Sequence, residues 1–190
     1  MRKVLTLHPK EFAETCIRLA EEAGAFAPEI IVGVLTGGGE VGRILKERFP
    51  DTIYFEVHLH RSGTKRKRNL RPLLRLLPTK VANRLRVFES KRLENRNHST
   101  KSVSLPESLC AYIREHDSAR VLIVDDAVDS GHTLLSVVEA VKKLSPTTEI
   151  RTAVLTVTTS SPVINPDYAL WRDGTLLRFP WSHDYHRRRR

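Results

Sequence analysis

Apolar positions along the first sixty residues alternate between helical spacing and short β-branched runs. Residues 9–24, PKEFAETCIRLAEEAG, place apolar side chains at helical intervals and end at Gly24, a plausible C-cap. EIIVGVL (29–35) predicts a buried strand, and the glycine-rich TGGGE follows at once. VGRILKERF then predicts a helix ended by Pro50, and TIYFEVHLH (52–60) predicts the next strand. This order predicts a βαβ unit with a glycine turn at the carboxyl end of its first strand.

The same alternation returns in the second half of the chain. PESLCAYIREH (106–116) predicts a helix with Pro106 in its first turn, and VLIVD (121–125) predicts a buried strand. TLLSVVEAVKKL (133–144) predicts a helix, and RTAVLTVTT (151–159) predicts another strand. Strands that alternate with helices favour an α/β fold, with a mostly parallel central sheet covered by helices on both faces.

A basic segment from about 61 to 104 interrupts this pattern. RSGTKRKRN predicts a mobile loop, whereas LRPLLRLL and KVANRLRVFESKRLEN predict short amphipathic helices broken at Pro78. Residues 61–101 hold 14 Lys and Arg against two acidic residues, a net charge of +12, although the whole chain carries only +10. The segment could contact phosphates, nucleic acid or an acidic partner, or it could be a solvated charged face.

Length and composition favour one globular domain, residues 1–190. Hydrophobic residues make up 40% and charged residues 28%, which is typical of globular proteins rather than disordered or membrane ones. No apolar run is long enough to span a bilayer, and MRKVLTLHPKEF lacks the features of a signal peptide. The two cysteines are too few for a disulfide framework. We therefore expect a cytoplasmic protein without membrane contacts.

The stretch VLIVDDAVDSGHT (121–133) ends a buried strand in paired acids, a feature of at least three kinds of protein. A receiver domain needs roughly a hundred residues after its acid pair, whereas 64 residues follow Asp126. A P-loop hydrolase needs a glycine loop closed by Lys-Ser or Lys-Thr, and LTGGGEVGR has neither. An enzyme that binds a phosphorylated sugar is the interpretation that remains.

The residue types of this stretch suit a sugar phosphate. Asp125 and Asp126 could bind the vicinal hydroxyls of a ribose and a magnesium ion. After Asp129, the turn SGHT leads directly into a helix, whose N-terminal amides and dipole favour a phosphate. Gly131 allows the backbone to approach the ligand closely. In an open parallel sheet, this turn and the glycine turn should lie at the carboxyl ends of strands, where such folds bind ligands.

VLIVDDAVDSGHTL resembles the phosphoribosyl pyrophosphate (PRPP) motif of the type I phosphoribosyltransferases, and GVLTGGGEVGRIL lies where that family binds pyrophosphate. The resemblance implies Mg²⁺-dependent transfer of a 5-phosphoribosyl group from PRPP to a nucleobase. It implies that Asp125 and Asp126 bind the metal and the ribose. The residues that would hold the ribose and 5-phosphate also include Asp129, Ser130, Gly131, His132 and Thr133. Those that would hold pyrophosphate are Thr36, Gly37, Gly38 and Gly39, with Lys65 and Arg66 from the mobile loop.

The resemblance also indicates the base. Enzymes of the family that act on 6-oxopurines typically have an acid where Asp129 lies, as a general acid or base. DYALWRDGTLLRFPW resembles the base-recognition end of the bacterial xanthine-guanine enzymes, so residues 160–186 would form a small C-terminal hood. In that hood, the side chains expected near the base are Leu177, Phe179 and Trp181.

Two departures weaken the purine assignment, and they leave a rival function open. No Lys follows the strand that ends near Thr158, although the purine enzymes usually place one there to bind O6. Ser182 stands where an acid is usual, with Asp184 two residues later. The rival is a regulatory protein that keeps the PRPP or nucleotide site and binds nucleic acid through its basic segment. Asp129 favours the enzyme and the +12 segment favours the regulator. A homodimer is expected from the family alone, and residues 69–104 could be a lid or an interface.

Overall fold

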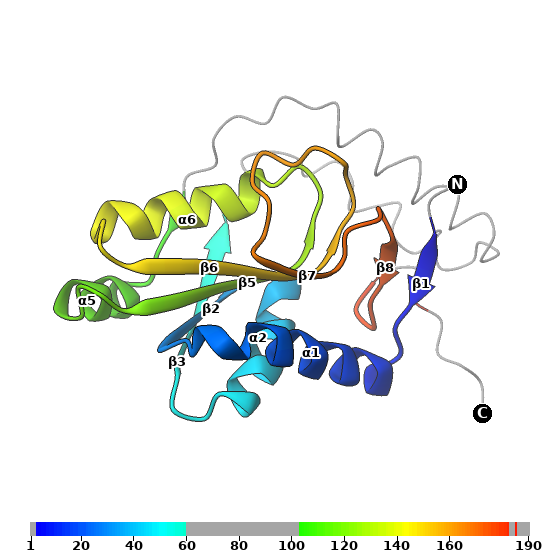
Figure 1. The fold of residues 1–190 in the computed structure, drawn as a ribbon, viewed down its shortest axis with the longest axis horizontal. Coiled ribbons are helices and arrows are strands. Elements are labelled where there is room, and N and C mark those ends of the chain that lie inside the picture. Colours follow the sequence, from blue (N-terminus) through cyan, green and yellow to red (C-terminus); the bar gives the residue numbers. More distant parts are fainter. Residues whose placement is uncertain (1–2, 60–102, 183–184, 186–190) are drawn as a thin grey trace, which may run out of the picture.

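The computed structural model describes residues 3–59, 103–182 and 185, arranged as a central sheet between two helical layers (Figure 1). Residues 60–102 lie outside the described residues, so the mobile loop and the two amphipathic helices expected in the basic segment stay predictions. Of that segment, only residues 103 and 104 are described. In chain order, the elements are β1 (Val4–Thr6), α1 (Pro9–Ala23), the 3₁₀ helix η1 (Gly24–Phe26), β2 (Ile30–Val34), α2 (Gly37–Arg48), β3 (Ile53–Leu59), β4 (Val103–Ser104), α5 (Glu107–Glu115), β5 (Arg120–Val128), α6 (His132–Leu144), β6 (Glu149–Val157), β7 (Tyr168–Trp171) and β8 (Leu176–Arg178).

The central sheet has six strands in the order β4-β3-β2-β5-β6-β7. All neighbouring pairs are parallel except the edge pair β3–β4, which is antiparallel. In Figure 1, α1 and α2 lie on one side of the sheet and α5 and α6 on the other. The predicted α/β class is therefore confirmed.

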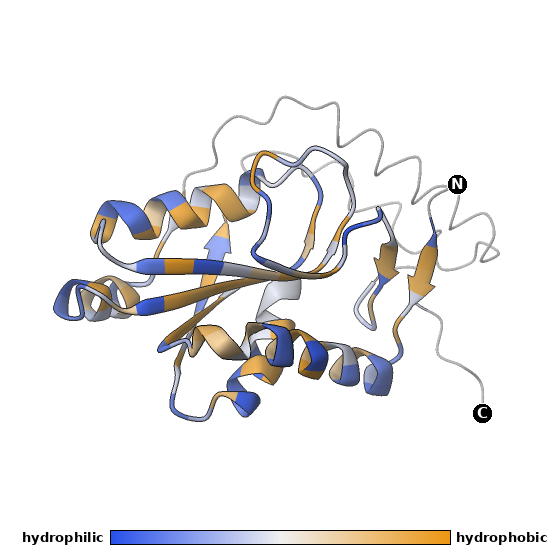
Figure 2. Ribbon diagram, viewed as in Figure 1, coloured by the Kyte–Doolittle hydropathy of each residue, from blue (hydrophilic) through white to orange (hydrophobic). Residues whose placement is uncertain are grey.

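Each face of the sheet has its own hydrophobic core. In β5, Leu122 and Val124 pack with α1 and α2, whereas Val121 and Ile123 pack with α5 and α6. This alternation follows from the two-residue period of a strand, and it explains why the central strands read as continuous apolar runs. Figure 2 shows the apolar colour concentrated on these strands and on the helix faces turned toward them.

Two element boundaries differ from the sequence-based expectation, and a third agrees with it. β5 continues beyond residue 125 to Val128, so the paired acids lie inside a strand. α2 begins at Gly37, so the glycine run forms the first turn of a helix and not a loop. Gly24 does occupy the C-cap position of α1, but its φ of −58° is right-handed and the chain continues into η1. The left-handed residue that ends this region is Ala27, with φ 48°.

Both ends of the described chain build the small hood. Strands β7 and β8, on either side of Arg172-Asp173-Gly174, do not pair with one another. β7 joins the central sheet beside β6, whereas β8 pairs in parallel with β1. The hood is therefore made by β1 as well as by the C-terminal segment. Within the ranges that the structure describes, no helix combines the length and apolarity required to cross a membrane.

Candidate active site

The candidate site lies where the parallel neighbours β2 and β5 end and where α2 and α6 begin. The turn after β5 reaches α6 through Gly131, whose φ of 85° lies in the left-handed region that favours glycine. A Cβ on Gly131 would also stand 3.2 Å from the Ile164 side chain, which is a tight contact. The N-terminus of α6 thus faces the carboxyl edge of the sheet, where its dipole attracts an anion such as a phosphate.

The loop between β6 and β7 packs against the turn of residues 129–131, called the phosphate turn below because it is predicted to hold the 5-phosphate. The backbone N–H of Val163 donates a hydrogen bond of 3.0 Å to the carbonyl oxygen of Ser130. In Figure 1 the loop after β6 and the loop after β5 stand side by side at the same edge of the sheet. The residues that follow β6 therefore support the phosphate turn, at the place where the purine enzymes were expected to carry a Lys.

Asp125 and Asp126 lie half-buried near the end of β5. The backbone N–H of Asp126 donates a 2.8 Å hydrogen bond to Oδ1 of Asp125. Burial, and then the charge of Asp126, raises the pKa of Asp125 well above its usual range. Burial raises the pKa of Asp126 to about 6, against the lowering effect of its contact with Asp125, and the charge of Asp129 adds to the rise. Two carboxylates held in this way gain stability from a cation.

The first turn of α2 rests directly on this acid pair. A Cβ on Gly37 would overlap the carboxylate of Asp126, and a Cβ on Gly38 would overlap the carbonyl oxygen of Val124. The peptide bond that leads into this turn, between Leu35 and Thr36, is cis. The structure therefore brings the predicted pyrophosphate residues 36–39 next to the predicted metal and ribose residues.

The donor set fits magnesium bound together with substrate. No group of three or more His, Cys, Asp or Glu able to hold a metal occurs among the described residues, so these side chains do not build a closed cage. Mg²⁺ commonly binds through one or two carboxylates and completes its coordination with water and substrate phosphates. Asp125 and Asp126 offer such a partial set at the edge of the site.

Asp129 has an exposed side chain with one fixed partner. The hydroxyl of Thr158 donates a 2.5 Å hydrogen bond to Oδ1 of Asp129, and the backbone N–H of Thr158 donates a 2.9 Å bond to Val128 O. The sequence reasoning did not identify Thr158 as a site residue. The available signal was a polar β-branched residue at the end of the strand next to the motif strand.

Two of the three expected base contacts lie in the core. Leu177 and Phe179 are 4% and 6% exposed and belong to the cluster packed by α1. Trp181 is half-buried and stacks on Phe179 at 4.8 Å between ring centroids, while Phe12 meets it edge-on at 5.0 Å. In this structure these side chains stabilise the hood, and their contact with a base stays a prediction.

Other expected site residues fall into two groups. Ser182, which replaces the usual acid, accepts a 2.9 Å hydrogen bond from the backbone N–H of Phe179 and so closes a turn. Lys65, Arg66 and Asp184 lie outside the described residues.

Comparisons with known proteins agree with this geometry. The family described as "Phosphoribosyl transferase domain" matches residues 7–175. A purine phosphoribosyltransferase from Pyrococcus horikoshii shares the fold with a TM-score of 0.63 and 22% identity over 94% of each chain. A xanthine-guanine-hypoxanthine phosphoribosyltransferase from Helicobacter pylori gives 0.60 and 16%, over 94% of this chain and 93% of that chain. A Neisseria gonorrhoeae protein solved with bound ppGpp also gives 0.60 and 16%, over 95% and 90%.

No curated protein sequence matches the chain. The family match nevertheless spans most of its length, and the site it covers has the acid pair, the phosphate turn and the glycine-led helix in one place. The chain belongs to the phosphoribosyl transferase domain family.

Proposed function

We propose that this chain transfers the 5-phosphoribosyl group of PRPP to a 6-oxopurine. The observation that carries the proposal is the position of Asp129, an exposed carboxylate in the turn between the acid-bearing strand β5 and helix α6. A proton acceptor at that point can reach the base while the turn holds the 5-phosphate. The structures named above as purine and xanthine-guanine-hypoxanthine enzymes support the same class of acceptor.

In the proposed reaction, a purine ring nitrogen attacks C1 of the ribose. The bond from C1 to the pyrophosphate oxygen breaks, pyrophosphate leaves with that electron pair, and the new C–N bond forms. Asp129 accepts the proton that the purine must lose, as a general base within hydrogen-bond reach of the ring. The backbone of residues 36–39 would bind the leaving pyrophosphate, and residues 129–133 would keep the ribose phosphate in place.

Asp125 and Asp126 would hold Mg²⁺ together with the ribose hydroxyls. When bound, Mg²⁺ would neutralise charge on the departing pyrophosphate. The raised pKa values of both carboxylates support this role, because a pair of partly buried acids is more stable beside a cation. We also propose a homodimer, by analogy with the family, and a cytoplasmic location, which suits the free thiols of Cys16 and Cys110.

A regulatory protein is the second candidate. The segment 61–101 carries a net charge of +12, and no Lys occurs between Thr158 and Arg190. A protein of this kind would bind PRPP or a nucleotide without turnover and would bind nucleic acid with an affinity that falls steeply with salt. The ppGpp-bound Neisseria structure supports a nucleotide ligand for this fold, although it supports no nucleic-acid contact.

The deciding experiment measures pyrophosphate release from PRPP with Mg²⁺ and a panel of purine and pyrimidine bases. It compares the wild type, Asp129→Asn and Asp51→Asn, which changes an exposed acid in the turn after α2. We expect release with hypoxanthine, guanine or xanthine, a fall of about 10²–10⁴-fold in Asp129→Asn, and no change in Asp51→Asn.

Silence with every base would contradict the enzyme. If PRPP or a guanine nucleotide still bound the silent wild type, the regulatory candidate would replace it. Release with a pyrimidine instead of a purine would keep the transferase and overturn the proposed base.

A further inference from the structure

The residue that follows strand β6, Thr158, binds the carboxylate of Asp129. Thr158 is 4% exposed, and its hydroxyl donates to Oδ1 of Asp129 at 2.5 Å. The Thr158 backbone is fixed as well, because its N–H donates to the carbonyl oxygen of Val128 at 2.9 Å. These contacts therefore join the residue after β6 to the last residue of β5 and to the turn that follows it.

This arrangement restricts an otherwise exposed side chain. A β-branched residue has few χ1 rotamers, so a buried threonine with a fixed backbone presents its hydroxyl in one direction. A hydrogen bond to an ionised carboxylate is short and strong. The bond occupies Oδ1 of Asp129 and leaves Oδ2 as the oxygen that can meet a ligand at the site.

We propose that Thr158 is a positioning residue that holds Asp129 in the orientation needed to accept the proton of the base. The inference rests on the proposed function and adds a determinant to it. General base catalysis depends on geometry, since the base must be within hydrogen-bond reach of the proton it removes. An Asp129 side chain that rotates away from Thr158 loses that geometry, although the PRPP contacts of the turn remain.

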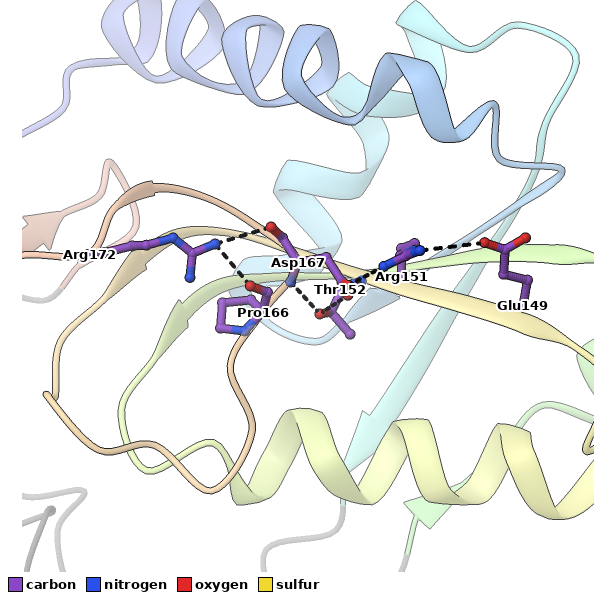
Figure 3. Close-up of polar contacts among 6 residues, drawn as sticks. All are labelled: Glu149, Arg151, Thr152, Pro166, Asp167 and Arg172. Atoms are coloured by element: carbon purple, nitrogen blue, oxygen red, sulfur yellow. Dashed lines mark hydrogen bonds and ion pairs between the residues drawn. The ribbon is translucent and has the colours of Figure 1, made fainter.

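Thr152, within strand β6, offers a matched control. Thr152 is 3% exposed, and its hydroxyl donates to Oδ2 of Asp167 at 2.9 Å, so it too makes a buried threonine–aspartate bond. Figure 3 shows Thr152 beside Asp167, in the network that also holds Arg151 and Arg172. Thr158 lies six positions after Thr152, a length of about 20 Å along an extended chain. Thr152→Val therefore removes this bond far from Asp129, together with the 3.0 Å bond that the Thr152 hydroxyl accepts from the backbone N–H of Asp167.

The test compares steady-state kinetics of Thr158→Val, Thr158→Ser and Thr152→Val with the base that the wild type accepts. We expect Thr158→Val to lower kcat by about tenfold or more, a fraction of the about 10²–10⁴-fold effect of a positioned base. Its KM for PRPP should stay unchanged. Thr158→Ser, which keeps the hydroxyl, should recover most of kcat, and Thr152→Val should keep full kcat although its loss of thermal stability should be at least as large. In an Asp129→Asn background, Thr158→Val should add little.

A kcat that is equal in Thr158→Val and Thr152→Val would overturn the positioning role, and so would full additivity with Asp129→Asn. An inactive wild type would contradict the proposed function instead. In that case crystal structures of the wild type and Thr158→Val still decide the inference. A single Asp129 rotamer in the wild type that changes or divides in the variant supports it, and the same single rotamer in both proteins overturns it.

Discussion

Glycine stands at the start of both helices beside the end of β5, as the first residue of α2 and as the residue before α6, but for different physical reasons. At α6, Gly131 has a φ of 85°, so its conformation requires glycine. At α2, residues 37–39 lie in a right-handed helix that any residue can adopt. What is missing there is space, because a Cβ on Gly38 would overlap Val124 O and stand 2.7 Å from the Cα of Asp125. Gly131 is required by its own backbone conformation, whereas the glycines of α2 are required by the close approach of β5.

This difference has a functional consequence. A turn that needs one conformation can be built from its own residues, so α6 can present its N-terminus to a phosphate without help from other elements. The glycines of α2 bring its backbone close to Asp125 and Asp126, so the amides predicted to bind pyrophosphate lie beside the carboxylates predicted to bind the metal. Glycine-to-alanine substitutions at the two helix starts distinguish a requirement for backbone conformation from a requirement for space.

Gly38→Ala should have the largest effect. Its Cβ would meet backbone atoms of β5 that cannot rotate away, so α2 and β5 must separate. We expect a loss of about 3 kcal/mol in the free energy of unfolding, at the upper end of the cost of overpacking a core. Urea denaturation followed by circular dichroism measures it. A loss below about 0.5 kcal/mol, the usual range of a neutral surface substitution, would show that the two elements are not in close contact.

Asp126→Asn tests the acid pair beneath α2 and should have a smaller effect of the opposite sign. Because burial raises the pKa of Asp126 to about 6, above the value of about 3.9 for an exposed Asp, the wild type loses stability as the pH rises through about 6. The Asn side chain does not titrate. We therefore expect equal stabilities below the pKa of an exposed Asp and an advantage for the variant of at most about 3 kcal/mol at alkaline pH.

Thermal melts across that pH range measure the difference, and magnesium supplies the control. If Mg²⁺ binds the ionised carboxylates as proposed above, adding it to the wild type at alkaline pH should raise the melting temperature, whereas Asp126→Asn should respond weakly. Removal of the metal with a chelator should restore the original difference. A variant that is less stable than the wild type at every pH would contradict the raised pKa.

The sequence alone could predict some parts of this site and not others. The motif 121–133 shows its acids, its turn and its helix in consecutive residues, because each depends on local conformation. The start of α2 at Gly37 could not be read in the same way, since helix propensity argues against three glycines and only the contact with β5 explains them. The pairing of β8 with β1 was equally hidden, because it joins the two ends of the chain.

The hood illustrates the same limit for the base site. The resemblance placed Leu177 and Phe179 near the base, but burial of both against the α1 layer depends on packing that no local pattern reports. The bond from Thr158 to Asp129 likewise joins residues that follow different strands. The local conformation of the turn after β5 was therefore predictable, whereas the contacts of the hood and of Asp129 required the fold.

Gly131→Ala should cost less than Gly38→Ala. A non-glycine residue in the left-handed region costs about 1–2 kcal/mol, and the nearest atoms, in the side chain and backbone of Ile164, stand at 3.2 Å. We expect a loss of that size in unfolding free energy and weaker binding of PRPP, because the turn proposed to hold the 5-phosphate must shift. Calorimetric titration with PRPP measures the second effect. Unchanged affinity would show that PRPP binding does not depend on the left-handed backbone conformation at position 131.

The smallest effect should come from Gly24→Ala, in which neither reason for glycine applies. Gly24 has a right-handed φ of −58°, and a Cβ there would meet nothing within 4 Å. Alanine should therefore stabilise the protein by about 0.4–1 kcal/mol, since it restricts the unfolded chain without straining the folded one. The same urea experiment gives the value, and activity should not change. A destabilised Gly24→Ala would mean that glycine substitutions weaken this fold for a reason other than conformation or space, and the losses at Gly38 and Gly131 could then no longer be assigned to either.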